Sequence, residues 1–191
     1  MKFLKELLQN MLPITESEWD IIRNVIIEKR INPKEQLIND GQIAKAIYFV
    51  KDGLLRVYHL KDGKEITTYF SSDGLFISTY SSFITQKPTF EILEAIEESI
   101  VYEFSYQALN NLYQLDPKFE KIGRYLAEQN YLCIFERTLS MQTKTAKEKY
   151  LDFITTNHPK IVQRAPQHQI ASFLGIAPES LSRIRREIVI S

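Results

Sequence analysis

Residues 167–186 contain the side chains whose types and spacing could do chemistry. They read QHQIASFLGIAPESLSRIRR, with two short apolar helical patterns on either side of Gly175. The second pattern places Glu179, Arg183 and Arg186 on its polar face. A guanidinium is a planar fork of donors that matches the two acceptors of guanine, and it also pairs with phosphate. These arginines could therefore recognise a nucleic acid.

The glycine and the proline of this segment predict how its two helices are joined. Gly175 supplies the left-handed backbone of a tight turn, and Pro178 fits the first turn of the second helix. Ala171 is small where the helices would cross closely. The shared core would be formed by Ile170, Leu174, Ile176, Leu181 and Ile184. We therefore predict a helix-turn-helix, and the alternative is a plain helical hairpin that does not contact nucleic acid.

The outward positions of this helix pair are the candidate DNA contacts. They are Gln167, His168, Glu179, Ser180, Ser182, Arg183, Arg185 and Arg186. We expect Arg183 to contact a base, and Arg185 and Arg186 to bind phosphates. Glu179 either accepts a hydrogen bond from a cytosine amino group or favours the helix dipole, and the sequence leaves both open.

The charge distribution agrees with a nucleic-acid partner at the C-terminal end. The 191 residues have a formal net charge of zero. Residues 140–191 carry eight Lys and Arg against four Asp and Glu, so this end is formally +4 and the remainder −4. A mildly basic segment is weak evidence by itself, and the helix-turn-helix pattern is what favours DNA.

Composition and spacing exclude several other classes. The apolar runs are shorter than the roughly 20 residues that cross a bilayer, and residues 1–12 lack the features of a signal peptide. We therefore expect a cytoplasmic protein without a membrane partner. The only cysteine, Cys133, cannot form an internal disulfide or hold an iron–sulfur cluster, and a small buried hydrophobe is expected there. A cupin-like metalloenzyme needs clustered histidines, but His59, His158 and His168 are scattered, so we predict no metal, no cofactor and no enzyme activity.

Residues 30–104 predict an antiparallel β-roll, and with the helices around it an α+β fold. Short runs rich in β-branched and aromatic residues are separated by Asp-Gly pairs at positions 40–41, 52–53, 62–63 and 73–74. This even spacing is typical of a barrel or sandwich of the jelly-roll kind. Two short helices precede the roll, and Thr15 with Glu18 forms a capping-box pattern at the start of the second.

Residues 116–140 predict one long helix that pairs two copies of the chain. One apolar stripe contains Phe119, Ile122, Leu126 and Cys133, and a parallel stripe contains Tyr125, Leu132 and Leu139. The roll could cover only one stripe, so the helix of a second copy would cover the other. The alternative is one wide stripe covered within a single chain. The expected domains are the roll with its helices at 1–115, the long helix at 116–140 and the helix-turn-helix at 141–191.

The chain resembles the Crp/Fnr family of transcription regulators over nearly its whole length. The resemblance lies in the order of its predicted elements, a roll followed by a long helix and then a helix-turn-helix. Residues 48–57, YFVKDGLLRV, resemble the family's aromatic-rich strand, glycine turn and next strand. Residues 178–184, PESLSRI, resemble its recognition helix, and the resemblance implies that Glu179 and Arg183 read bases. Pro178 replaces the first base-reading arginine of the cyclic-AMP-responsive members, and a reduced β-wing is expected because Ser191 follows the recognition helix closely.

The resemblance also implies partners and a means of control. A bacterial homodimer would bind a pseudo-palindromic site in double-stranded DNA and contact RNA polymerase. A small molecule or partner at the cyclic-nucleotide-binding-like roll would move the long helices and so the reading helices. The rival interpretation is an effector-binding or protein-interaction module of the same fold that does not bind DNA.

The effector pocket departs from the family pattern. The family's phosphate-binding cassette has a Gly-Glu pair and a later arginine, whereas Ser78-Thr79 and Thr89 hold the matching places here. Glu91 and Glu94 add negative charge nearby without a guanidinium, so we expect cyclic AMP not to bind. The candidate pocket residues are Ser78, Thr79, Thr89, Glu128, Gln129 and Asn130. A pocket for another small molecule and a filled roll both stay open.

Overall fold

Two four-stranded antiparallel sheets form the predicted roll. The structure is a computed structural model that describes residues 1–190, with side chains through Ile188. The first sheet has the order β1 (Ile26–Ile31), β8 (Ser99–Ser105), β3 (Ala46–Asp52) and β6 (Phe76–Ile77). The second has the order β2 (Gln36–Ile38), β7 (Glu91–Ala95), β4 (Leu54–Lys61) and β5 (Lys64–Ser72). Together with the helices, these sheets confirm the predicted α+β class.

The Asp-Gly pairs form turns with left-handed backbone, as their chemistry predicts. The glycine of each pair has a positive φ: +79° at Gly41, +126° at Gly53, +74° at Gly63 and +82° at Gly74. Asp62 and Gly63 close the β4–β5 hairpin with two consecutive positive φ values. A side chain at Gly53 would lie 2.1 Å from Ser99 Oγ, so the turn after β3 also needs glycine for close contact with β8.

Five short helical segments contribute side chains to the core of the roll. They are α1 (Lys2–Met11), α2 (Glu16–Asn24), α3 (Tyr80–Thr85), α4 (Tyr106–Leu115) and the 3₁₀ helix η1 (Pro117–Phe119). The Thr15 hydroxyl accepts a hydrogen bond from the Glu18 amide, and the Glu18 carboxylate accepts one from the Thr15 amide, which confirms the capping box. Lys118 also donates to Glu18 and thereby joins η1 to α2.

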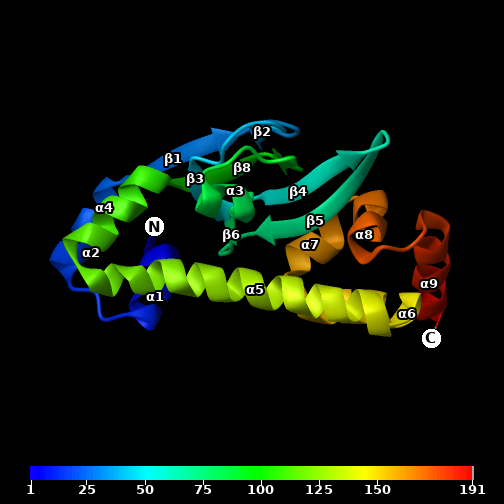
Figure 1. Cartoon of the computed structure of the whole chain (residues 1–191). Helices are drawn as coiled ribbons and strands as arrows, with labels where there is room; N and C mark the ends of the chain where they lie inside the picture. Colours follow the sequence, from blue (N-terminus) through cyan, green and yellow to red (C-terminus); the bar gives the residue numbers. More distant parts are fainter. Residues whose placement is uncertain (191) are drawn as a thin grey trace.

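The long helix α5 (Glu120–Thr143) runs alongside the roll from the α4 end of the molecule to the C-terminal helices (Figure 1). Three members of the first predicted stripe, Phe119, Ile122 and Leu126, are buried in the core of the roll, whereas the fourth, Cys133, is half-buried rather than buried as expected. The helix was expected over residues 116–140, but the Asp116 side chain caps a 3₁₀ turn at Pro117–Phe119 and α5 begins after it. It continues to Thr143, beyond the predicted end at residue 140.

The second apolar stripe of α5 differs from the prediction at its N-terminal end. Tyr125 is half-buried and packs against the core of the roll, so its assignment to an uncovered stripe was wrong. Further along the helix, several large apolar side chains are exposed: Tyr131 (66% exposed), Leu132 (47%), Ile134 (58%), Phe135 (52%) and Leu139 (48%). The uncovered face of α5 therefore lies in its second half.

Four helices follow α5 and share a second apolar core. They are α6 (Ala146–Thr156), α7 (Pro159–Arg164), α8 (Gln167–Leu174) and α9 (Pro178–Ile190). The core contains Phe153, Ile161, Ile170, Leu181 and Ile184, and it also includes Leu54 of β4 and Phe70 of β5. The roll therefore contributes directly to the packing of the C-terminal helices. Helix α9 stays helical to Ile190, the last described residue.

Candidate nucleic-acid interface

Helices α8 and α9 form the predicted helix-turn-helix. Gly175 ends α8 with φ +64°, in the left-handed region. Its amide donates to the Ser172 carbonyl at 3.1 Å, and the Ile176 amide donates to the Ala171 carbonyl at 3.0 Å. Ala171 and Leu181 are completely buried between the helices. The local signals in the sequence therefore correctly predict this turn and its core.

One face of α9 is polar and exposed at the end of the molecule farthest from the N-terminal helices (Figure 1). Glu179, Arg183 and Arg186 follow at intervals of four and three residues, so they lie on the same face. Ser182 is exposed as well, and its carbonyl accepts a hydrogen bond from Arg186 Nε at 3.4 Å. Leu181 and Ile184 bury the opposite side of the helix. This geometry presents two guanidinium groups and one carboxylate to solvent.

The other predicted contacts lie at the edges of this face. Ser180 and Arg185 are half-buried. Gln167 and His168 are exposed in the first turn of α8, where free backbone amides favour an anion. Glu179 lies in the first turn of α9, which is where a carboxylate favours the helix dipole. Both roles considered for Glu179 are therefore compatible with its position.

Hydrogen bonds join the helix-turn-helix to the β4–β5 hairpin of the roll. The Ser172 hydroxyl accepts from the Thr67 amide at 3.0 Å and donates to the Glu65 carbonyl at 2.9 Å. Arg137 of α5 donates through Nη2 to the carbonyls of Thr67 and Phe173, each at 3.3 Å. The long helix, the roll and α8 therefore meet at one point. These junction residues were not predicted as functional, because no local pattern connects them.

Aromatic packing reinforces the same junction. Phe70 of β5 lies 5.3 Å from Phe173 of α8 and 6.5 Å from Phe153 of α6, measured between ring centroids. The Arg137 guanidinium lies 5.0 Å from the centre of the Phe173 ring. Apolar burial at the hairpin therefore holds α8 in place in addition to the hydrogen bonds.

Comparisons with known proteins agree with this architecture. Residues 28–116 match the sequence model of the family described as the cyclic nucleotide-binding domain. A putative transcriptional regulator of the crp/fnr family from Eubacterium rectale superposes with a TM-score of 0.70 at 18% identity, over 95% of this chain and 88% of that one. The chain has the Crp/Fnr regulator fold.

Two further solved structures are similar to this fold. FixK2 from Bradyrhizobium japonicum has a TM-score of 0.78 at 18% identity, over 87% of this chain and 85% of that one. The c-di-GMP-responsive global regulator CLP of Xanthomonas campestris has a TM-score of 0.69 at 18% identity, over 92% of each chain. A search of curated proteins found no significant match. No helix within residues 1–190 is both long and apolar enough to span a bilayer.

Of the three predicted pocket residues in the roll, the side chains of Ser78 and Thr89 are hydrogen-bonded to neighbouring backbone and, within the described part of the chain, that of Thr79 is not. Ser78 donates through Oγ to the Ala46 carbonyl at 2.8 Å. Thr89 Oγ1 accepts from the Glu91 amide at 2.9 Å. Thr79 is completely buried at the start of α3, and within residues 1–190 its hydroxyl has no hydrogen-bond partner. Of these three side chains, Thr79 is the one that keeps an unsatisfied polar group.

The predicted pocket residues on α5 are more accessible to solvent. Glu128 and Gln129 are exposed, and Glu128 pairs with Arg124 one turn earlier on the same helix at 3.5 Å. Asn130 is half-buried. The structure thus places the two halves of the predicted pocket in different surroundings, one inside the roll and one largely on the surface of α5.

One electrostatic expectation for the roll is wrong, because Glu94 does have a guanidinium beside it. Arg56, whose side chain is 3% exposed, lies 2.9 Å from Glu94 and 2.6 Å from Glu65, measured from Nη2 to the carboxylate oxygens. Its guanidinium carbon also lies 4.0 Å from the centre of the Tyr58 ring. Glu91 accepts from the Thr68 hydroxyl, and burial raises the pKa of its carboxyl. The two glutamates therefore do not form a simple uncompensated negative patch.

A cavity of about 240 Å³ lies outside the predicted pocket. It is bounded by α1, by strands β3 and β8 and by the start of α7, and it is lined by Phe3, Leu4, Phe49, Lys51, Asp73, Tyr102 and His158, among others. None of the predicted effector residues lines it.

Proposed function

We propose that the chain is a homodimeric, sequence-specific DNA-binding transcription regulator of the Crp/Fnr type. The observation that carries this proposal is the exposed face of α9, on which Glu179, Arg183 and Arg186 lie together after a glycine-turned helix pair. An α-helix of this size fits the major groove of DNA. With DNA as its partner, the protein would act in the cytoplasm.

The proposed interface contains one base-reading arginine and several contacts to the DNA backbone. Arg183, in the middle of the exposed face, would pair with the O6 and N7 acceptors of a guanine. Arg185 and Arg186 would bind phosphates, and Gln167 and His168 would position α8 on the backbone of the duplex. Ser180 and Ser182 complete the set of contacts. Phosphate contacts fix the orientation of the protein, whereas Arg183 would supply sequence information.

Dimerisation is proposed through the second half of α5. Five large apolar side chains are exposed there, from Tyr131 to Leu139. Isolated exposed apolar residues are common on monomers, whereas a cluster of this kind indicates an interaction surface. Leu132, Phe135 and Leu139 follow the four- and three-residue spacing of a coiled-coil seam. The same helix of a second copy would cover this face. Two recognition helices would then meet half-sites about one helical turn apart, roughly 34 Å.

We further propose that control acts through the roll and that cyclic AMP is not the effector. The places of the cassette's glutamate and arginine hold Thr79 and Thr89, so a cyclic phosphate would find no guanidinium from the cassette. Thr89 is additionally held by hydrogen bonds with the loop at Gly41 and Gln42. A different small molecule or a protein partner would shift the roll relative to α5. RNA polymerase is proposed as a further partner by analogy with the family.

The deciding experiment is selection of bound duplexes from a random DNA pool, followed by affinity measurements at several salt concentrations. We expect a pseudo-palindromic site. Arg183→Ala should cost about 1–3 kcal/mol and relax specificity at one base position in each half-site. Arg186→Ala should weaken binding to all sequences alike and reduce the salt dependence. If no duplex is bound in a salt-dependent manner, the proposal fails in favour of a protein-interaction module.

A further inference from the structure

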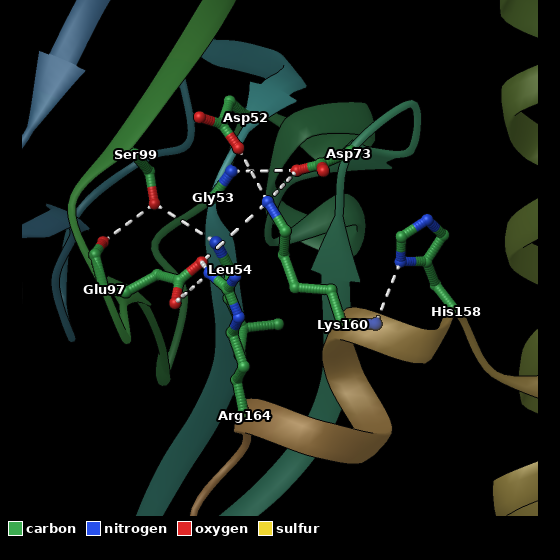
Figure 2. A network of polar contacts seen from close by, with 9 residues as sticks. All are labelled: Asp52, Gly53, Leu54, Asp73, Glu97, Ser99, His158, Lys160 and Arg164. Carbon is green, nitrogen blue, oxygen red and sulfur yellow. Dashed lines mark hydrogen bonds and ion pairs between the residues drawn. The ribbon is translucent and has the colours of Figure 1, made fainter.

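Lys160 of α7 is surrounded by carboxylates of the roll (Figure 2). Its Nζ lies 2.6 Å from Asp52 Oδ1, 2.6 Å from Asp73 Oδ1 and 3.9 Å from Glu97 Oε1. Arg164, one turn later on α7, donates through Nη1 to both oxygens of Glu97 at 3.2 Å. We call these five residues the Lys160 cluster. It joins the C-terminal helices to the roll at a second point, separate from Ser172 and Thr67.

The three carboxylates come from three separate turns at one end of the roll. Asp52 ends β3, Asp73 lies between β5 and β6, and Glu97 lies between β7 and β8. These turns are bonded to neighbouring backbone as well, as Figure 2 shows. Asp73 accepts from the Gly53 amide at 2.9 Å, and the Glu97 carbonyl accepts from the Ser99 hydroxyl at 2.8 Å. The roll therefore presents its carboxylates to α7 from ordered positions.

The setting of Lys160 makes this cluster stronger than an ordinary surface ion pair. Its side chain is only 12% exposed, and one ammonium is shared by several carboxylates. Burial lowers the pKa of Lys160, but its hydrogen bonds to Asp52 and Asp73 and the negative charges of these two carboxylates together raise the pKa by more, so the amine is charged at neutral pH. Isolated exposed pairs contribute little, whereas partly buried networks of this kind are less screened by solvent. Removing Lys160 would leave neighbouring carboxylates uncompensated.

The position of α7 also determines where the reading helices lie. Only residues 165–166 separate α7 from α8, and both helices contribute to the same apolar core. In the arrangement that the cluster holds, Glu179, Arg183 and Arg186 are all exposed. The orientation observed here therefore leaves the proposed DNA-contacting face free.

We infer that the Lys160 cluster is a positioning device that holds the helix-turn-helix on the roll in its DNA-reading orientation. The inference rests on the proposed function and adds to it a set of residues outside the DNA interface. With the cluster intact, the reading-competent orientation is already populated before DNA arrives. Without it, the C-terminal helices occupy other orientations, and apparent affinity falls with the competent fraction.

Neutralising acidic residues of the cluster provides the test, because general electrostatics and the positioning role predict opposite changes in affinity for DNA. Asp52→Asn combined with Glu97→Gln removes negative charge, so general electrostatics alone would tighten binding to DNA or leave it unchanged. The positioning role requires the opposite: affinity for the selected duplex, measured by fluorescence anisotropy, should fall about five- to tenfold. Glu98→Gln is the matched control, because Glu98 is exposed on the same turn as Glu97 and lies outside the cluster. Tighter or unchanged binding by the double variant would overturn the inference.

Charge exchange provides a second, independent comparison. Lys160→Glu should weaken binding more than the double acid variant, since it places a fourth carboxylate in the cluster. Adding Asp52→Lys to Lys160→Glu restores the original set of charges in exchanged positions, and we expect it to recover most of the lost affinity. If Lys160→Glu binds as tightly as the parent, the cluster does not position the reading helices.

A distance measurement without DNA separates this inference from the proposed function. Spin labels are placed at Asn111→Cys on α4 and Thr155→Cys on α6, in a Cys133→Ser background. They report the distance between α4, which packs against the roll, and the C-terminal helices. Labelled chains are mixed with excess unlabelled protein so that only distances within one chain are seen. The distribution should be narrow in the parent and broad or shifted after Asp52→Asn with Glu97→Gln. A narrow, unchanged distribution would refute the cluster's role even if the protein binds no DNA.

Discussion

Ser172 of α8 and Thr67 of β5 are joined by a hydrogen bond in which the Thr67 amide donates to the Ser172 hydroxyl at 3.0 Å. The hydroxyl in turn donates to the Glu65 carbonyl at 2.9 Å. Strand β5 is at the edge of its sheet, and edge strands carry backbone groups that no neighbouring strand satisfies. Helix α8 thus takes the place of a further strand at this position, which explains why the hairpin and the helix-turn-helix pack together.

Removing the Ser172 hydroxyl should therefore destabilise the chain. Thr67 is completely buried, so Ser172→Ala leaves its amide without this partner. We expect the free energy of unfolding, from urea denaturation, to fall by about 1–3 kcal/mol. Ser81→Ala, at an exposed serine of α3, is the matched control and should change stability by less than about 0.5 kcal/mol. Equal effects of the two substitutions would show that the bond to Thr67 contributes nothing.

Gly63 reports backbone strain alone, whereas Gly53 combines strain with a close contact. At Gly63, φ +74° is near the left-handed α region, where alanine is strained by roughly 1–2 kcal/mol, and φ +126° at Gly53 is less favourable still for alanine. A Cβ at Gly63 meets nothing within 4 Å, whereas one at Gly53 would lie 2.1 Å from Ser99 Oγ and 2.7 Å from Ser99 Cα. We expect Gly53→Ala to lower the unfolding free energy by about 1–3 kcal/mol more than Gly63→Ala. Similar losses at the two glycines would mean that Ser99 moves aside freely.

The exposed half of α5 predicts a change in oligomeric state. Leu132→Asp combined with Leu139→Asp would place carboxylates in the proposed helix–helix contact, where desolvation disfavours them. Sedimentation velocity at micromolar concentration should show a dimer for the parent and a monomer for this variant. Lys121→Asp changes a charge at an exposed position near the start of the same helix and should remain dimeric. A monomeric parent would contradict the proposed dimer directly.

Local signals predicted much of the fold, because they depend on a few neighbouring residues. The Asp-Gly turns, the Thr15 capping box and the Gly175 turn each follow from the backbone preferences of one or two residues, and the structure shows all of them. The start of α5 was misplaced for the same reason. Proline at the first position fits an α-helix and a 3₁₀ turn equally well, and only the capping geometry of Asp116 distinguishes them.

The contacts between distant segments could not be predicted in this way. Lys160 and Asp52 are 108 positions apart, and no periodicity connects them. Asp52 and Asp73 were interpreted only as turn residues, although both also bind the lysine of α7. Arg56 was likewise missed as the partner of Glu94, because pairing between β4 and β7 brings them together. The helix-turn-helix and its exposed polar face depend on local pattern and could therefore be predicted, whereas their attachment to the roll could not.

The hydrogen bonds of Glu18 predict how stability responds to acid. Its pKa lies at about 2, below the ordinary value of 4.5, chiefly because Lys118 donates to the carboxylate and also because Thr15 donates through its amide and hydroxyl. A carboxyl whose pKa is lower in the folded state than in the unfolded state stabilises the fold when both states are ionised. This contribution is present above about pH 4.5 and is lost as the pH falls toward 2.

Glu18→Gln should therefore lower the free energy of unfolding at neutral pH. The size of this loss should decrease as the solution is acidified. The measurement is the unfolding free energy of parent and variant from urea titrations between pH 2 and 7, with their difference plotted against pH. Other carboxyls of low pKa, such as Asp52 and Glu148, titrate in both proteins and cancel in that difference. Glu98→Gln, at an exposed glutamate between β7 and β8, serves as the control for losing a carboxylate. A difference that does not change across this range would show that the bond from Lys118 does not tie η1 to α2 in solution, since protonation of a bonded Glu18 must weaken that bond.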